Sequence, residues 1–118
     1  MNPLTEKLGA ASWLEVPQGY LRLVDMDFVK LGYWYIYTDT DQMLYYSAAL
    51  RERYPERELI MFAKRNDCDT VACWQRGMGE KIILIDDFEP PGFEFGREYD
   101  NFWTWFRDAI ERVIQEPW

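Results

Sequence analysis

The residues of this chain that could carry out a reaction are mainly carboxylates, because the sequence contains no histidine. Without imidazole the chain has no Ser–His or Cys–His nucleophile pair and lacks the usual general base near neutral pH. Two aspartate pairs have a spacing that could serve chemistry: Asp67 with Asp69, and Asp86 with Asp87. An enzyme built on this sequence would have to use such carboxylates, or Lys, Tyr or Cys side chains.

Asp67 and Asp69 stand two residues apart and could ligate a hard cation such as Ca²⁺ or Mg²⁺. A calcium loop of the EF-hand type needs further acids at fixed offsets, but residues 70–72 are Thr, Val and Ala. The alternative is a turn in which short polar side chains bind their own backbone. We favour the turn, and we expect neither a metal nor another cofactor.

Asp86 and Asp87 follow an apolar run, at a position where many folds carry catalytic carboxylates. Neighbouring acids divide acid and base roles only where their surroundings separate their pKa values, and nothing in the sequence indicates such a separation. Strand alternation predicts that one of the two side chains faces solvent. We therefore interpret the pair as a solvated strand end and assign no catalytic residue.

A third candidate is a surface rather than a reactive site. Residues 86–98 combine five acids with three phenylalanines around Pro90 and Pro91. Aromatic rings rimmed by charge are typical of protein interfaces, since the rings supply buried area while carboxylates steer a basic partner. The alternative is that the rings fold back over the core; we favour it for Phe88 and leave both possibilities open for other rings. The predicted partner-binding residues are Asp67, Asp69, Asp86, Asp87, Glu89, Phe93, Glu94 and Trp105.

A β-sheet must position these acids. The run Ile82–Ile85 contains three β-branched residues and predicts a central strand covered on both faces. Leu59–Lys64 and Val71–Arg76 flank four turn-forming residues and predict a hairpin that leads into this strand. Because the connections are short, these three strands must be antiparallel. A fourth strand is predicted at residues 32–37, and the prolines and glycines of residues 86–96 predict an irregular loop.

Helices are predicted on both sides of the strand at residues 32–37. One begins at Pro17 and turns Tyr20, Val24 and Leu21 inward. A second begins after Asp39, which caps it together with Gln42, and its inward positions are Met43, Ser47, Leu50 and Tyr54. Residues 1–16 carry only a weak helical pattern, interrupted by a glycine.

The last helix is predicted at about residues 101–115, with Asp100 as its N-cap. Its apolar residues recur at helical spacing, and we expect them to pack on the sheet and to contribute much of the fold's stability. The predicted stripe comprises Phe102, Trp103, Phe106, Ile110, Val113 and Ile114. Trp105 lies off this stripe, so it is a candidate for the surface, with the alternative that its ring folds over the core left open.

Composition predicts one folded domain of 118 residues, because 48% of them are hydrophobic and 18% aromatic. The formal charge of −8 makes nucleic acid and anionic membranes poor partners, since phosphate binding requires Lys and Arg. A basic protein partner is the natural inference. The alternative is that the acidity simply keeps the protein soluble.

Cys68 and Cys73 are five residues apart, which fits neither a redox nor a zinc motif, so we expect two free thiols. The N-terminal residues lack the pattern of a secretory signal, and no stretch of about 18 apolar residues occurs. We therefore expect a soluble protein of the reducing cytoplasm, a monomer or a homodimer.

Three segments of the chain resemble the SUKH superfamily: LIMFAKRNDCDTVACW at residues 59–74, KIILIDDF at 81–88 and EYDNFWTWF at 98–106. This superfamily contains yeast regulators of cell-wall glucan synthesis and many bacterial immunity proteins. The resemblance, over about residues 17–115, implies an α+β domain with N-terminal helices, a curved sheet and a closing C-terminal helix. It also implies a binding module that neutralises a toxin, often a nuclease, and it brings no catalytic residues.

The expected fold is thus a single α+β domain, residues 1–118, with a mainly antiparallel sheet of about four strands and a C-terminal amphipathic helix packed on it. The expected function is that of a non-enzymatic, cytoplasmic bacterial immunity protein that presents an acidic, aromatic surface to a basic toxin domain. One alternative is a regulatory scaffold that binds another cellular protein or a small ligand. Another is a hydrolase that uses the two aspartate pairs.

Overall fold

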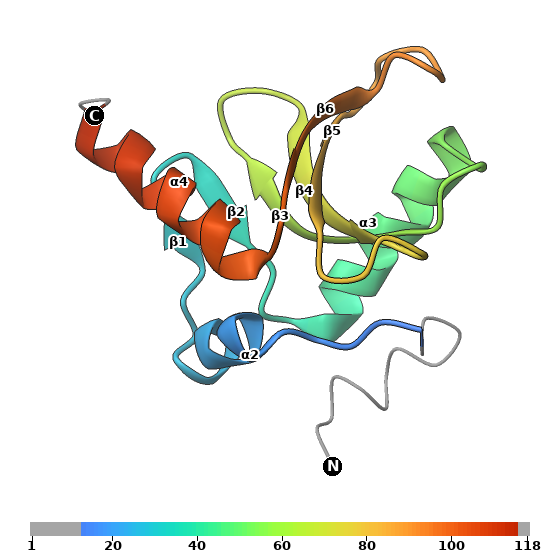
Figure 1. Cartoon of the computed structure of the whole chain (residues 1–118). Helices are drawn as coiled ribbons and strands as arrows, with labels where there is room; N and C mark the ends of the chain where they lie inside the picture. The colour runs from blue at the N-terminus through green and yellow to red at the C-terminus, as the bar shows by residue number, and fades with distance from the viewer. Residues whose placement is uncertain (1–12, 116–118) are drawn as a thin grey trace.

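The structure, a computed structural model, describes residues 13–115, so residues 1–12 of the weakly patterned segment 1–16 lie outside the described residues, and residues 13–16 form no helix. Within this range three helices accompany six strands (Figure 1). In chain order the elements are α2 (Gln18–Asp25), β1 (Lys30–Leu31), β2 (Trp34–Ile36), α3 (Thr40–Arg53), β3 (Leu59–Arg65), β4 (Thr70–Gln75), β5 (Ile82–Asp86), β6 (Phe95–Tyr99) and α4 (Phe102–Gln115).

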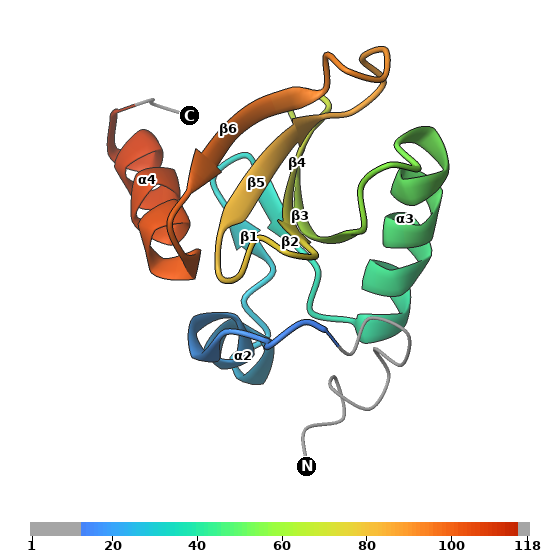
Figure 2. The same ribbon diagram turned by 45° about the vertical axis from the view of Figure 1, so that its right-hand side comes forward.

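The six strands form one sheet in which their order in space equals their order along the chain, and every neighbouring pair is antiparallel. The predicted α+β class and the antiparallel run of β3, β4 and β5 are confirmed. Helix α3 and helix α4 lie on opposite sides of this sheet, and α2 lies near one of its ends (Figures 1 and 2). One face of the sheet is therefore covered by α3 and the other by α4.

Two strands escaped the sequence analysis, because neither has an alternating apolar pattern. β1 is only two residues long. β6 is exposed at four of its five positions, and it bulges at Gly96, opposite the step from Leu84 to Ile85. The prediction of an irregular loop at residues 86–96 is therefore wrong at its end, where β6 begins. The predicted central strand is β5, which lies one place from the sheet edge; β3 and β4 form the middle.

Aromatic rings dominate the core between the sheet, α2 and α4. Phe62 of β3 stacks on Trp74 of β4 with 4.4 Å between ring centroids, and Trp105 of α4 meets Phe62 edge-on at 5.0 Å. Tyr20 of α2 packs against Phe62 and Trp74, and its hydroxyl donates a hydrogen bond to the Tyr37 carbonyl. Because such rings bury large areas and prefer these geometries, the cluster fixes both helices to one face.

The local predictions for α3 are confirmed. The Asp39 side chain accepts a hydrogen bond from the Gln42 backbone N–H at 3.2 Å and so caps the helix. The Ser47 hydroxyl accepts from the Met61 N–H at 2.8 Å, which ties the helix to β3. The predicted inward residues of this helix and its C-cap are all buried: Met43, Ser47, Leu50 and Tyr54.

Helix α2 packs directly on α4. Tyr20 is buried as predicted, Leu21 and Val24 are half-buried, and Leu23 is a buried residue that was missed. A Cβ atom on Gly19 would lie 2.6 Å from Cδ1 of Phe102, so the two helices touch at a place where only glycine fits.

Helix α4 is rotated relative to the prediction. Trp105, a predicted partner-binding residue, is 1% exposed, whereas Trp103, expected in the core, is 42% exposed. The cap is Asn101 and not Asp100, because the Asn101 side chain accepts from the Thr104 N–H at 2.9 Å. The buried positions are Phe102, Trp105 and Ala109; Phe106 and Val113 are half-buried, and Trp103, Ile110 and Ile114 face solvent.

Candidate functional site

The connection between β5 and β6 carries the most exposed aromatic rings of the sheet. We call residues 87–95 the aromatic hairpin. Its three phenylalanines, Phe88, Phe93 and Phe95, are 65%, 75% and 48% exposed. The hairpin projects from the body of the molecule beyond the last turn of α3 (Figures 1 and 2). The expectation that Phe88 folds back over the core is therefore wrong, and Phe93 faces solvent.

The first anchor of the hairpin is an ion pair between Asp87 and Arg53 of α3. The guanidinium donates through Nε to Oδ1 at 2.7 Å and through Nη2 to Oδ2 at 2.6 Å, a two-pronged geometry that is stronger than a single contact. The same guanidinium lies 4.6 Å from the centroid of the Phe88 ring. Asp87 is therefore part of the support of the hairpin, and its charge is compensated.

The backbone of Phe88 is held in an unusual conformation, with φ at +71°. A bulky side chain rarely adopts the left-handed region, and such a residue costs on the order of 1–3 kcal/mol. The Phe88 N–H donates to Asp87 Oδ1 at 2.9 Å, and Arg53 covers the ring. These contacts offset the strain and keep the ring outside the core, an arrangement typical of functional sites.

The second anchor is the buried carboxylate of Glu94. It accepts hydrogen bonds from the Gly92 N–H at 2.6 Å and from Arg57 Nε at 2.7 Å, while Arg57 also binds Gln75. The Gly92 N–H and then the Arg57 guanidinium lower the pKa of Glu94, against the opposing effect of burial. A third contact runs from the Tyr54 hydroxyl to the Glu89 carbonyl at 2.8 Å.

Glu94→Gln should destabilise the protein by about 1–2 kcal/mol at pH 7, because charge-assisted hydrogen bonds are lost. Since the folded-state pKa of Glu94 lies below its ordinary value of 4.5, its contribution is fully present above pH 4.5 and disappears as the pH falls through the folded-state pKa. Urea unfolding of both proteins between pH 7 and pH 3 measures this. The difference between the two unfolding free energies should shrink with acid; a constant difference contradicts the assignment.

The remaining predicted acids lie at the base of the hairpin or in the turn between β3 and β4. Asp86 accepts a hydrogen bond from Thr70 at 2.9 Å. Asp69 is exposed, and its carbonyl accepts from the Asp87 N–H at 3.1 Å, which brings the two aspartate pairs together through backbone. Asp67 forms a two-pronged ion pair with Arg65 at 2.6 and 2.8 Å, and this contact lowers its pKa.

Three exposed glutamates add negative charge on or near the hairpin. Glu89 on the hairpin and Glu52 and Glu56 near the end of α3 are exposed, and none of them forms a salt bridge with another residue in the range 13–115. The two nearby arginines are already occupied by Asp87 and Glu94. The surface around the phenylalanines is therefore acidic.

The sequence analysis missed the roles of Arg53, Tyr54 and Arg57 as supports of the hairpin, although it placed Tyr54 in the core. Each lies more than 30 positions from its partner on the hairpin, for example 34 positions between Arg53 and Asp87. No local spacing reveals such a contact. The sequence signal that could have suggested these contacts is the alternation of acids and arginines in residues 51–58, at the end of the second predicted helix.

Trp105 is not part of this surface. Its ring meets that of Trp34 edge-on at 5.3 Å and is buried under the sheet. The prediction that Trp105 contacts a partner requires an accessible ring, so the burial excludes it. The rings that remain available at the hairpin are those of Phe88, Phe93 and Phe95.

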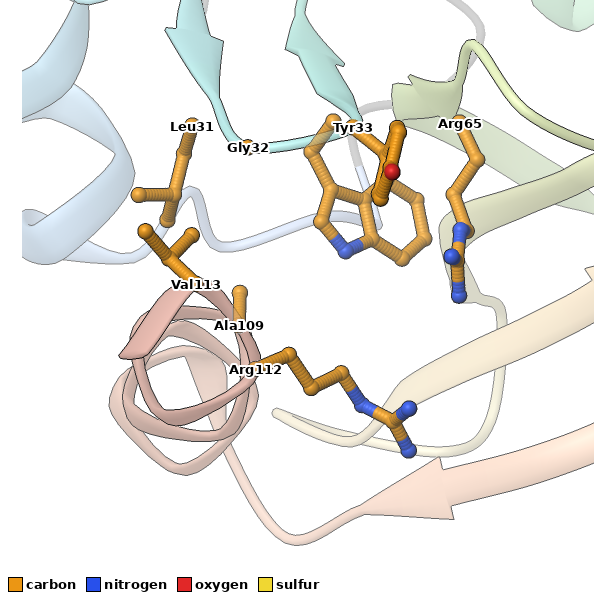
Figure 3. A pocket seen from close by; sticks show the side chains of 8 residues that line it. Leu31, Gly32, Tyr33, Arg65, Ala109, Arg112 and Val113 are labelled. Carbon is orange, nitrogen blue, oxygen red and sulfur yellow. The ribbon is translucent and has the colours of Figure 1, made fainter. Parts of the chain in front are cut away.

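Two hollows in the described part of the chain bear on ligand binding. The first lies between the β1–β2 turn and α4, where Leu31, Ala109 and Val113 point toward one another beside Tyr33 and Arg65 (Figure 3). Its volume of about 10 Å³ is the room of a single water molecule. The second is an open groove beside the aromatic hairpin, lined by Tyr54, Pro55, Glu56, Arg57, Gln75, Pro91, Gly92 and Glu94. It extends the hairpin surface rather than enclosing a substrate.

Within residues 13–115, no cluster of three or more Cys, Asp and Glu side chains has a geometry suited to a metal ion. No helix in this part of the chain combines the length and apolarity needed to cross a membrane. Comparisons of the chain with protein-family models, curated proteins and solved structures found no match in any of the three.

Proposed function

We propose that this protein is a non-enzymatic binding module, a cytoplasmic immunity protein of the SUKH type, which docks a basic toxin domain through the aromatic hairpin and its acidic surroundings. The observation that carries the proposal is the exposure of three phenylalanines on a hairpin that is held by two ion pairs, one from Arg53 of α3 and one from Arg57 in the α3–β3 connection. Solvent-exposed aromatic rings of this number are unfavourable for an isolated domain and are typical of interaction sites.

The rigidity of the hairpin supports binding rather than passive solubility. A loop that is already fixed loses little conformational entropy when a partner docks, and this raises affinity without new contacts. Arg53, Tyr54 and Arg57 provide that fixation from one side. The partner then meets three rings in a defined arrangement.

Charge supports a basic partner in particular. Glu89 lies on the hairpin and Glu56 in the groove beside it, neither forms a salt bridge within residues 13–115, and the whole chain carries −8. Opposite charge across an interface accelerates association and rejects acidic partners. A nuclease domain, whose substrate groove must be positive to hold phosphate, has the matching chemistry. Occlusion of that groove by the hairpin is the proposed mechanism.

The test is calorimetric titration of this protein with the toxin-like domain encoded next to it. We expect stoichiometric binding, and we expect the association rate to fall as salt rises from 50 to 500 mM. Inhibition of the toxin's activity should follow the occupancy of the complex. Absence of heat with a folded, active toxin domain overturns the proposal.

A charge reversal locates the surface. Glu89→Lys should slow association with the basic domain about tenfold at low salt, because it replaces attraction by repulsion at the rim. Glu15→Lys, at an exposed position before α2, changes the net charge equally but lies on another part of the chain, so it is the matched control. Equal effects of both variants would show that net charge alone, and not the hairpin, drives association.

A further inference from the structure

Three of the eight apolar residues of α4 face away from the core. Trp103, Ile110 and Ile114 are exposed along one side of the helix, and Ile114 reaches 71% exposure. Met26, at the end of α2, is 64% exposed beside them, and an apolar hollow between the two helices is lined by Met26, Phe28, Trp103 and Phe106. We call this set the α2–α4 face. It is separate from the aromatic hairpin (Figures 1 and 2).

The exposed residues of α4 form a straight stripe. At about 100° per residue, Trp103, Arg107, Ile110 and Ile114 fall within about 60° of the helix circumference. The buried residues Trp105 and Ala109 point elsewhere. Apolar residues thus span about half of the circumference, which is wider than one packed face requires. The apolar residues that do not pack on the sheet form a second face, which the described part of the chain does not cover.

The charge of the α2–α4 face differs from that of the rest of the molecule. Helix α4 carries Arg107, Asp108, Glu111 and Arg112, and α2 carries one arginine and one aspartate, so each helix is neutral in a chain of charge −8. A strongly basic partner gains nothing from a neutral face. A second copy of this acidic chain, by contrast, is repelled less here than elsewhere.

We propose that the α2–α4 face binds the same face of a second copy, with the two α4 helices antiparallel about a two-fold axis near residue 109. In such an isologous contact both copies use the same surface, so each contact between two residues occurs twice, once with the roles of the copies exchanged. The axis brings Trp103 of one copy near Ile114 of the second copy. The stripe is therefore complementary to itself.

The charges beside the stripe are also self-complementary. Arg107 and Glu111 lie on the same flank, and the same flanks of two antiparallel helices face each other. Arg107 of one copy then lies opposite Glu111 of the second copy, twice in the dimer. Among the described residues Arg107 has no ion pair within its own chain, whereas Arg112 pairs with Asp108. The unpaired arginine supplies the charge that the second copy's glutamate matches.

Sedimentation equilibrium at 5–200 μM tests the dimer. The chain has a mass of 14.3 kDa, and we expect a transition to twice that value with rising concentration. Ile114→Asp should raise the dissociation constant at least tenfold, since it places two charges in the apolar contact. Tyr45→Asp, at an equally exposed position on α3, is the control and should leave the dimer unchanged. A monomer throughout, or a dimer indifferent to Ile114→Asp, overturns the proposal.

A charge exchange defines the geometry. Arg107→Glu alone and Glu111→Arg alone should each raise the dissociation constant about tenfold, because each creates two like-charge contacts. An equimolar mixture of the two variants should dimerise like the unmodified protein, since every contact across the mixed dimer is again Glu with Arg. A mixture that stays as weak as its components excludes the antiparallel arrangement.

Discussion

Trp105→Ala is expected to lower the free energy of unfolding by about 3–5 kcal/mol, the effect of removing a fully packed tryptophan. The ring is 1% exposed and lies against Trp34 and Phe62, so its loss leaves a cavity under the middle of the sheet. For a domain whose total stability is about 5–15 kcal/mol, this is a large fraction. Urea denaturation followed by far-UV circular dichroism measures the change.

Trp103→Ala is the matched control, because the same residue type is removed two positions away on the same helix. Its ring is 42% exposed, so we expect a loss of about 1 kcal/mol. Both variants should be measured at a protein concentration low enough to keep the copies apart, since association would add to apparent stability. Equal losses at both positions contradict the observed rotation of α4.

The combined substitution Phe88→Ala and Phe93→Ala is expected to weaken binding of the basic partner about a hundredfold or more. Each exposed ring acts as an anchor, and truncating an anchor at the centre of an interface typically costs about 1–2 kcal/mol or more. Two such losses together raise the dissociation constant roughly a hundredfold. Calorimetry with the toxin domain gives the dissociation constants directly.

Stability separates this result from a folding defect. Both rings are mostly exposed, so the double variant should unfold at nearly the same urea concentration as the original protein. Tyr45→Ala, which removes an exposed ring from α3, should leave the affinity unchanged. A double variant that binds within threefold of the original protein would show that the hairpin does not carry the interaction.

Much of the fold follows from local patterns. The β-branched run at residues 82–85, the hairpin formed by β3 and β4, and the Asp39 cap of α3 all depend on neighbours in sequence, and all three are present. Hydrophobic periodicity indicates which segments are strands and which are helices, because each element must place its apolar side chains on the face that it buries.

The features that could not be predicted depend on distant residues. The apolar arc of α4 is so wide that periodicity alone does not tell which side meets the sheet; the fit of Trp105 between Trp34 and Phe62 decides it. β6 is polar and exists because its backbone pairs with β5. The ion pairs that hold the aromatic hairpin join residues more than 30 positions apart.

The order of the strands has a consequence for how the chain folds. Each strand pairs with the strand next to it in sequence, and between β3 and β6 the connections are short, so little loop-closure entropy opposes each step. The sheet can form by successive addition of neighbouring strands to the β3–β4 hairpin. The insertion of α3 makes the β2–β3 pairing the slowest of these steps, and β1 and β2 should therefore be the last strands to gain protection against hydrogen exchange during refolding.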